Sequence, residues 1–219
     1  MLELFALNIR EPIEEQMISD SMKMVSPETA ERIKRFRFKE DALRSLMGET
    51  MIRRWHCRRL HMDNAAIAIE RNLYGKPFVV GSPYHYSISH SGDWVVCAIS
   101  DNEVGIDIEE IKPIDFSLTS GFFTYSERLA LNTQPNDKKL EYFYALWTLK
   151  ESYIKYLGTG LSTPPDSFSF RLNGEKAVLS DPVRMPAPHF KQYIVDSRHK
   201  CALCSSTVES HNDFIMYNI

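Results

Sequence analysis

The sequence predicts an α+β protein built from two similar halves, and three observations lead to this prediction. Two long amphipathic helices are expected, one over about residues 39–59 and one over about residues 140–157. Short segments of alternating apolar and polar residues, which are typical of strands, lie around and between these helices. Residues 48–53 of the first helix are similar to residues 150–155 of the second. This similarity predicts a repeated unit with the ligand site in the cleft between the copies, although two amphipathic helices can also be similar by chance.

The other elements can be placed along the chain from local signals. Strands are expected over residues 2–9, 84–90, 94–100 and 104–109, of which residues 104–109 alternate strictly and residues 94–99 are a continuous apolar run. Ser26 can cap a helix whose first turn contains Pro27, and another helix is expected from about Ser126. Further strands are expected after Ser167. We place the boundary so that the two α+β halves comprise residues 1–103 and 104–219.

The composition is that of a soluble globular protein. Of the 219 residues, 43% are hydrophobic and 25% are charged, which argues against a disordered chain. The longest apolar run, residues 94–99, suits a buried strand and is too short to cross a membrane. The amino terminus carries an early acidic residue and no basic leader, so we expect a cytoplasmic protein. Cys201 and Cys204 fall in an expected strand without a complete set of zinc ligands, and we interpret the four cysteines as buried thiols.

The net charge of −3 hides a basic region in the first third of the chain. Its members are Arg32, Lys34, Arg35, Arg37, Lys39, Arg44, Arg53, Arg54, Arg58 and Arg59. Such a region suits a polyanionic ligand, and a solvated helix face is the alternative for most of these residues. Because no nucleic-acid-binding motif accompanies the region and the whole chain is slightly acidic, we expect no nucleic acid partner.

The second long helix carries a lysine in an unusual position. Lys150 lies in the middle of the apolar face of this helix, and Glu151 lies at the edge of that face. A lysine there needs a partner for its charge within the apolar surroundings, or it must extend its ammonium group out to water. The alternative to a functional role is an extended Lys150 together with an ordinary Glu151–Lys155 ion pair, which contributes roughly 0.2–0.5 kcal/mol.

Two carboxylates alternate on the expected strand over residues 104–109. Asp107 and Glu109 share one face with Gly105, while the valine and the two isoleucines of the strand fall on the other face. Carboxylates spaced in this way start about 7 Å apart at Cα, so both can bind one hard cation. Their mutual repulsion is unfavourable without a cation or open solvent, and acids that simply face water are the alternative. Gly105 indicates close approach of a ligand or of another backbone.

Five motifs then occur in a defined order along the chain. They are Gly75-Lys76-Pro77, Ser87-Ile88-Ser89-His90-Ser91, Val104–Glu109, Phe122–Glu127 and Trp147–Lys155. Their joint order and spacing, from Ser26 to about Ser169, resemble the 4′-phosphopantetheinyl transferases of the surfactin-synthetase-activating type. The resemblance implies a pseudo-dimeric fold in which the two similar α+β halves pack against each other.

The resemblance also implies an enzyme and a reaction. The phosphopantetheine arm of coenzyme A would move to a serine hydroxyl of an apo carrier protein, with Mg²⁺ as cofactor and adenosine 3′,5′-bisphosphate as second product. The carrier would be a domain of peptide or polyketide synthases or a protein of fatty-acid synthesis, in a setting such as nonribosomal peptide and antibiotic biosynthesis. Residues 119–125 would help to recognise it. Two fused halves would make a monomer sufficient.

By motif position, the resemblance implies roles for residues in both halves. The implied Mg²⁺ ligands are Asp107, Glu109 and Glu151. The residues implied to neutralise the diphosphate of coenzyme A are Lys150 and Lys155. Those implied to contact its phosphates or its nucleotide end are Lys76, Ser89 and His90, and those implied to receive the 3′-phosphate and adenosine are Arg32, Arg44 and Ser45. The implied catalytic residues are Glu127, Glu151 and Lys155, with one of the two glutamates as general base.

Some of these residues also have a structural interpretation. Glu127 lies three residues after Thr124, a spacing that fits a capping box at a helix start. His90 lies at a strand end beside a turn and can bond the turn backbone. Lys76, in a turn, can be an ordinary exposed lysine.

Two departures from the family pattern and two rival functions are left open. Ser87 stands where relatives commonly carry asparagine and Thr29 where some carry lysine, so the departures concern binding of the coenzyme and not the reaction class. One rival is a Mg²⁺-dependent phosphohydrolase or nuclease that uses Asp107, Glu109 and Glu151. The other is a non-catalytic module that binds carrier proteins.

Overall fold

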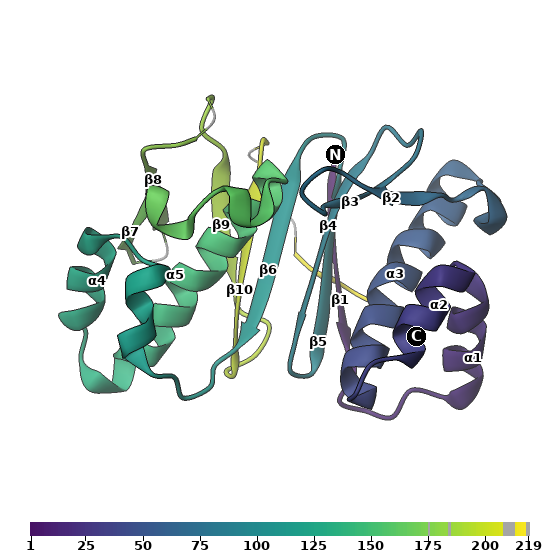
Figure 1. The fold of residues 1–219 in the computed structure, drawn as a ribbon, viewed down its shortest axis with the longest axis horizontal. Coiled ribbons are helices and arrows are strands. Elements are labelled where there is room, and N and C mark those ends of the chain that lie inside the picture. The colour runs from purple at the N-terminus through teal and green to yellow at the C-terminus, as the bar shows by residue number, and fades with distance from the viewer. Residues whose placement is uncertain (175, 184, 208–212, 218–219) are drawn as a thin grey trace.

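The computed structural model describes residues 1–174, 176–183, 185–207 and 213–217, which form two halves lying side by side (Figure 1). The first half contains β1 (Leu2–Asn8), α1 (Glu15–Met24), α2 (Pro27–Lys34), α3 (Lys39–Leu60), β2 (Ile69–Arg71), β3 (Pro77–Val79), β4 (His85–Ser91) and β5 (Trp94–Ser100). The second half contains β6 (Val104–Glu110), α4 (Tyr125–Asn132), α5 (Asn136–Leu157), β7 (Ser169–Asn173), β8 (Lys176–Ser180), β9 (His189–Tyr193) and β10 (His199–Ser205). The last strand is β11 (Ile215–Met216).

The two long helices predicted from the sequence are confirmed as α3 and α5. The α5 helix starts four residues before the predicted residue 140 and ends at Gly158, whose φ of 68° lies in the left-handed region that glycine tolerates best. Ser26 caps α2 as expected, because its Oγ accepts a hydrogen bond from the backbone N–H of Thr29. The α1 helix and the β2–β3 hairpin were not predicted.

Four layers make up the molecule, and they follow from the alternation of side chains along the strands. The β11-β1-β5-β4 sheet has α3 on its outer face, and the β6-β10-β9 sheet has α5 on its outer face. The inner faces of the two sheets pack together through apolar residues of β1, β5, β6 and β10. Val104, Ile106 and Ile108 of β6 lie in this central core, as predicted. The two α/β units are therefore related as two halves of a pseudo-dimer.

A row of serines joins the two sheets where β4 meets β6. These two strands are neighbours without a backbone ladder between them. The backbone N–H of Ile106 donates to Ser87 Oγ, and that of Glu110 donates to Ser91 Oγ, both at 3.0 Å. Serine hydroxyls thus satisfy backbone groups that a continuous sheet would have paired. This gives Ser87 a role at the seam between the halves.

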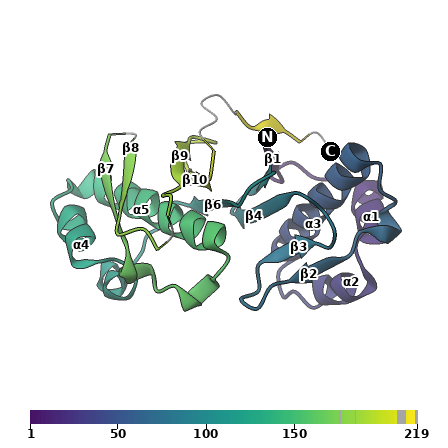
Figure 2. The same ribbon diagram turned by 90° about the horizontal axis from the view of Figure 1, so that it is seen from above.

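The end of the chain returns to the first half. The β11 strand pairs in parallel with β1, with Phe5 opposite Ile215, and extends the sheet of the first half (Figure 2). No pattern in the sequence predicted this pairing, because only two exposed residues form it. In the described part of the chain, none of the helices is both long and apolar enough to cross a membrane.

Gly105 lies where β6 packs against α5. The sequence predicted that a ligand or another backbone comes close to this glycine, and in the structure it is the backbone of α5. A Cβ atom at this position would overlap the carbonyl of Ser152 and the N–H of Tyr156. We expect Gly105→Ala to lower the free energy of unfolding by about 1–3 kcal/mol or more, because neither backbone can move aside. Urea unfolding measures this. The matched control is Gly121→Ala, whose added methyl meets open space and should cost less than about 0.5 kcal/mol.

Candidate active site between the two halves

A pocket of about 560 Å³, here called the central pocket, opens between the two halves. The first half lines it with Arg32, Arg44, Ser45, Gly48, Glu49, Ile69, Arg71, Pro77, Tyr86, Ile88, Ser89 and His90. The second half lines it with Asp107, Glu109, Trp147, Glu151 and Lys155. Glu49 and Glu151, which occupy equivalent places in the two similar helical segments, both face this pocket. A pocket thus lies between the halves, at the place where the internal similarity predicted the ligand cleft.

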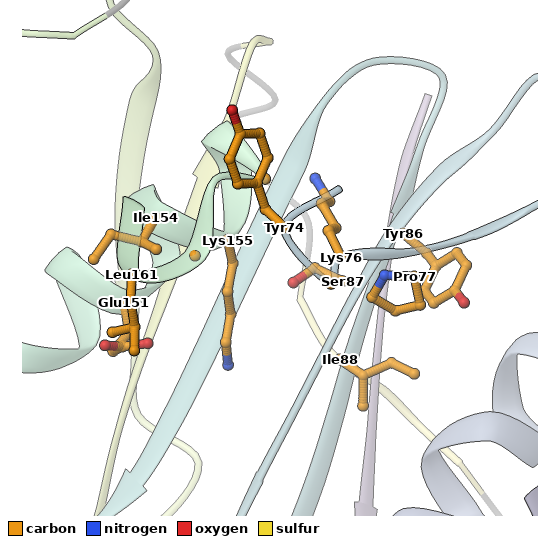
Figure 3. A pocket seen from close by; sticks show the side chains of 13 residues that line it. Tyr74, Lys76, Pro77, Tyr86, Ser87, Ile88, Glu151, Ile154, Lys155 and Leu161 are labelled. Carbon is orange, nitrogen blue, oxygen red and sulfur yellow. The ribbon is translucent and has the colours of Figure 1, made fainter. Parts of the chain in front are cut away.

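A smaller pocket of about 330 Å³ adjoins the central pocket (Figure 3). The residues that line both are Pro77, Tyr86, Ile88, Glu151 and Lys155. Its remaining lining is largely apolar and includes Tyr74, Ile154 and Leu161. The cleft thus offers a charged section and an apolar section side by side.

Asp107 lies at the floor of the central pocket and is 2% exposed. Its Oδ1 accepts hydrogen bonds from Ser89 Oγ at 2.8 Å and from Lys155 Nζ at 2.6 Å. Its Oδ2 is buried and has no hydrogen-bond partner among the described residues. Burial raises the pKa of the Asp107 carboxyl, although Lys155 and Ser89 act in the opposite direction. An ionised Asp107 therefore lacks part of the stabilisation that its charge requires.

Glu109 and Glu151 bring two more carboxylates to the same pocket from β6 and α5. Glu109 Oε2 accepts a hydrogen bond from Ser91 Oγ at 3.0 Å, and burial together with Asp107 raises the pKa of Glu109. Burial and the nearby Asp107 raise the pKa of Glu151 to about 6. The three carboxyl groups thus perturb one another, as acids that share a site do.

The three acids do not enclose a metal ion on their own. Within the described ranges, no three His, Cys, Asp or Glu side chains are arranged so that they could hold one. Lys155 Nζ forms an ion pair with Oδ1 of Asp107, so this carboxylate oxygen is not free to bind a metal ion. The implied set of Asp107, Glu109 and Glu151 therefore stays a prediction, and further ligands would have to complete it.

Lys150 and Glu127 do not line the central pocket, so their side chains are not placed there for the roles implied for them. Both side chains are buried, and they form an ion pair of 2.9 Å between Lys150 Nζ and Glu127 Oε2. Lys150 also donates to the carbonyls of Pro165 and Phe168, both at 2.7 Å. Glu127 closes the capping box of α4 with Thr124, the structural alternative that the spacing offered. Glu127 is thus the partner that Lys150 has within the apolar core.

Lys76 lines the smaller pocket, and its ammonium group forms contacts between the two halves. Its Nζ binds Glu103 Oε2 at 2.9 Å and the carbonyl of Val104 at 3.1 Å. Figure 3 shows the ammonium groups of Lys76 and Lys155 pointing in opposite directions. In the structure this side chain ties the β2–β3 hairpin to the second half, and the implied phosphate contact of Lys76 stays a prediction.

The implied nucleotide-binding residues do line the central pocket, but they differ in their freedom to bind. The guanidinium of Arg44 donates to Asp41 and to the carbonyl of Gly92, both at 2.5 Å, so it holds the β4–β5 turn. Ser45 and Arg32 face the pocket from α3 and α2. His90 lies at the exposed rim, and partial desolvation with the nearby Lys155 lowers its pKa, so it is neutral near pH 7.

Sequence reasoning missed several residues of this pocket, among them Trp147 and Arg71. Trp147, the first residue of the last motif, lines it from α5. Arg71 lines it from the end of β2, a short strand that no periodic pattern reveals. A lone arginine before a turn carries no local signal of a binding role.

The two halves match two family models in succession. Residues 11–102 match the model described as 4′-phosphopantetheinyl transferase, N-terminal. Residues 103–204 match the 4′-phosphopantetheinyl transferase superfamily. The 4′-phosphopantetheinyl transferase Sfp of Bacillus subtilis (strain 168) is 36% identical over 98% of this chain and 97% of that protein. The chain belongs to the 4′-phosphopantetheinyl transferases.

Other relatives of this transferase come from several organisms. The 4′-phosphopantetheinyl transferase gsp of Aneurinibacillus migulanus is 36% identical over 94% of this chain and 86% of that protein. The L-aminoadipate-semialdehyde dehydrogenase-phosphopantetheinyl transferase of Xenopus laevis is 29% identical over 85% of this chain and 70% of that protein. In the crystal structure of a Thermotoga maritima holo-[acyl-carrier-protein] synthase, the similar part covers 47% of this chain and 61% of that chain. The identity is 25% and the TM-score is 0.40. The family and the pseudo-dimeric α+β fold predicted from the motifs are confirmed.

The raised pKa of Glu151 gives this transferase a testable pH dependence of stability. A carboxyl whose folded-state pKa lies above its unfolded value stabilises the fold when protonated, and this contribution is lost as pH rises through the folded value. For Glu151 this stabilisation is lost as the pH rises from the unperturbed pKa of 4.5 to somewhat above the folded-state pKa of about 6. In EDTA, Glu151→Gln should therefore become more stable relative to the wild type as pH rises from 5 to 8. Thermal unfolding across that range measures the difference, and a constant difference would contradict the shift.

Proposed function

We propose that this transferase moves the 4′-phosphopantetheine arm of coenzyme A to a serine hydroxyl of an apo carrier protein. Adenosine 3′,5′-bisphosphate is the second product. The observation that carries the proposal is one pocket between the halves that collects the carboxylates of β6 and α5 and the ammonium group of Lys155. Membership of the transferase family over nearly the whole chain supports the reaction class.

The residues present fit a Mg²⁺ ion as the cofactor. Asp107, Glu109 and Glu151 are hard oxygen donors, and the buried Oδ2 of Asp107 is without a hydrogen-bond partner in the described part of the chain. Mg²⁺ prefers a few carboxylates completed by substrate phosphates and water, so this donor set suits it even though the three acids alone do not enclose an ion. When bound, the ion supplies neutralisation of the negative charge on the phosphates.

The chain's own residues supply the remaining requirements of the transfer. Lys155 Nζ lies 2.9 Å from Ser89 Oγ and 2.6 Å from Asp107 Oδ1, from where it can neutralise a phosphate oxygen. The carrier serine Oγ forms the new bond to the phosphorus next to pantetheine, and the bond from that phosphorus to the bridging diphosphate oxygen breaks. Glu151, with a pKa of about 6, can take the serine proton near neutral pH. Little else is needed for a phosphoryl-type transfer.

An exposed aromatic surface beside the pocket suits the carrier protein. Tyr125 is 70% exposed and Phe122 is 38% exposed, and the Phe122 ring packs against Trp147 at a centroid distance of 5.0 Å. Trp147 in turn lines the central pocket. We propose that carrier domains of peptide or polyketide synthases, or of fatty-acid synthesis, dock here. A monomer of two halves, residues 1–103 and 104–219, suffices because both halves already line the pocket.

One assay distinguishes this function from its rivals. The protein is incubated with coenzyme A, Mg²⁺ and an apo carrier protein, and the carrier is weighed by mass spectrometry. We expect the carrier to gain the mass of one phosphopantetheinyl group, with equimolar release of adenosine 3′,5′-bisphosphate. Cleavage of a phosphate ester with an unmodified carrier would indicate a phosphohydrolase. A stable complex without any turnover would indicate a binding module.

A further inference from the structure

Ser91, the last residue of β4, contacts the second half through its side-chain hydroxyl. The oxygen accepts a hydrogen bond from the backbone N–H of Glu110, and the hydroxyl donates to Glu109 Oε2, both at 3.0 Å. A serine hydroxyl has a single proton and two lone pairs. Because the N–H of Glu110 uses a lone pair, the proton remains available for the Glu109 carboxylate. Glu109 lines the central pocket and Ser91 does not, so this hydrogen bond reaches the carboxylate from outside the pocket.

The Glu109 carboxylate has a greater need of such support than that of Asp107. Asp107 is buried, and its short side chain is held by Ser89 and Lys155. Glu109 is only partly buried, and its longer side chain rotates about more bonds. Lys200 lies directly opposite Glu109 on β10, but its ammonium group binds Glu141 at 2.5 Å. The hydrogen bond from Ser91 is therefore well placed to fix the orientation of the Glu109 carboxylate.

From this arrangement we propose that Ser91 is a positioning residue, which holds the Glu109 carboxylate ready to bind Mg²⁺ and so raises the affinity of the pocket for the ion. The inference rests on the proposed function and adds to it a residue outside the pocket lining. Groups that hydrogen-bond a metal-binding side chain from behind orient it, and their loss typically weakens metal binding. Oxygen ligands held in place before the ion arrives lose less conformational entropy when it binds.

The turn between β4 and β5 keeps Ser91 in place. Gly92, the next residue, has a φ of 54°, in the left-handed region that favours glycine. A Cβ atom at Gly92 would lie 2.6 Å from His199 Nε2 and 2.7 Å from Glu110 Oε2, so the turn packs closely against the second half. On the other side, the guanidinium of Arg44 donates to the carbonyl of Gly92. The Ser91 hydroxyl is thus supported by a turn that both halves hold.

Direct measurement of Mn²⁺ binding tests the inference. Free Mn²⁺ is followed by electron paramagnetic resonance while the wild type, Ser91→Ala and Ser91→Thr are titrated at one fixed, saturating concentration of coenzyme A. We expect the Mn²⁺ dissociation constant of Ser91→Ala to rise about 10- to 100-fold. Ser91→Thr, which keeps the hydroxyl, should stay close to the wild type. In the carrier assay, Ser91→Ala should need more Mg²⁺ for half-maximal turnover, while kcat at saturating Mg²⁺ changes much less.

The matched control is Ser87→Ala at the same seam between the halves. Ser87 Oγ also accepts a backbone hydrogen bond at 3.0 Å, from the N–H of Ile106, and the hydroxyl is not bonded to a carboxylate of the pocket. Ser91 is partly exposed, so water can replace its oxygen as the partner of the Glu110 N–H and the variant should fold. Both alanine variants should lower the melting temperature in EDTA, but only Ser91→Ala should weaken the binding of Mn²⁺.

The outcomes separate this inference from the function on which it rests. A wild-type protein that does not modify the carrier with coenzyme A and Mg²⁺ would overturn the proposed function. A wild type that modifies the carrier, with an unchanged Mn²⁺ dissociation constant in Ser91→Ala, would overturn only the role of Ser91. An equal loss of Mn²⁺ affinity in Ser91→Ala and Ser87→Ala would also overturn it, because that result indicates a general effect at the seam.

Discussion

Asp107→Asn is expected to reduce carrier modification by about 10³-fold while the protein stays folded. The substitution removes the carboxylate that combines burial, contact with Lys155 and an oxygen without a hydrogen-bond partner within the described residues. The amide keeps the shape of the side chain and can still bond Ser89. Because burial disfavours the ionised carboxyl, its loss should change the melting temperature little. Discontinuous or mass-spectrometric assay of the carrier, with thermal unfolding beside it, measures both effects.

The control for Asp107 is Asp137→Asn, an exposed aspartate in the first turn of α5. We expect it to leave turnover unchanged. A purified, folded Asp107→Asn protein with near-normal turnover would remove Asp107 from the site.

Breaking the buried ion pair of Lys150 and Glu127 is expected to have the largest effect on stability. Either Lys150→Met or Glu127→Gln should lower the free energy of unfolding by about 3–5 kcal/mol, because each leaves a buried charge without its partner. The double variant should lose less than the sum of the two, since no lone charge is then left in the core. Urea unfolding of all three variants measures the coupling. Below their melting temperatures, the variants should still modify the carrier, because neither residue lines the pocket.

The ion pair of Lys200 and Glu141 is the matched control, since it also involves α5 but is partly exposed. Removing either partner of that pair should cost less than about 1 kcal/mol. Loss of turnover in a stably folded Lys150→Met protein would restore Lys150 to the site. Equal and small stability losses for both ion pairs would contradict the buried arrangement.

The local elements could be predicted from the sequence because each is marked by a short-range pattern. Gly158 ends α5, Ser26 caps α2, and the alternation over β6 separates its core face from its acidic face. The pairing of β11 with β1 could not be predicted. It is a long-range contact between a two-residue strand and an edge that is ready to accept one, and no periodic pattern marks such a strand.

Residues reach the central pocket as expected where motifs place them on regular elements, and they do not where a partner from elsewhere in the chain binds them. The alternation of β6 brings Asp107 and Glu109 to the pocket, and the helical period brings Glu151 and Lys155. The same period places Lys150 one residue away, on the buried face. A helical wheel shows that such a lysine needs a partner, but it does not show that the partner lies 23 positions upstream in Glu127.

The most direct test of the account is the position of a divalent ion in a crystal grown with coenzyme A and Mn²⁺, an anomalous scatterer that replaces Mg²⁺. We expect one strong anomalous peak in the central pocket, bound by carboxylate oxygens of Asp107, Glu109 and Glu151 together with the diphosphate of coenzyme A. An ion held elsewhere, or a diphosphate bound away from these three side chains, would contradict the account.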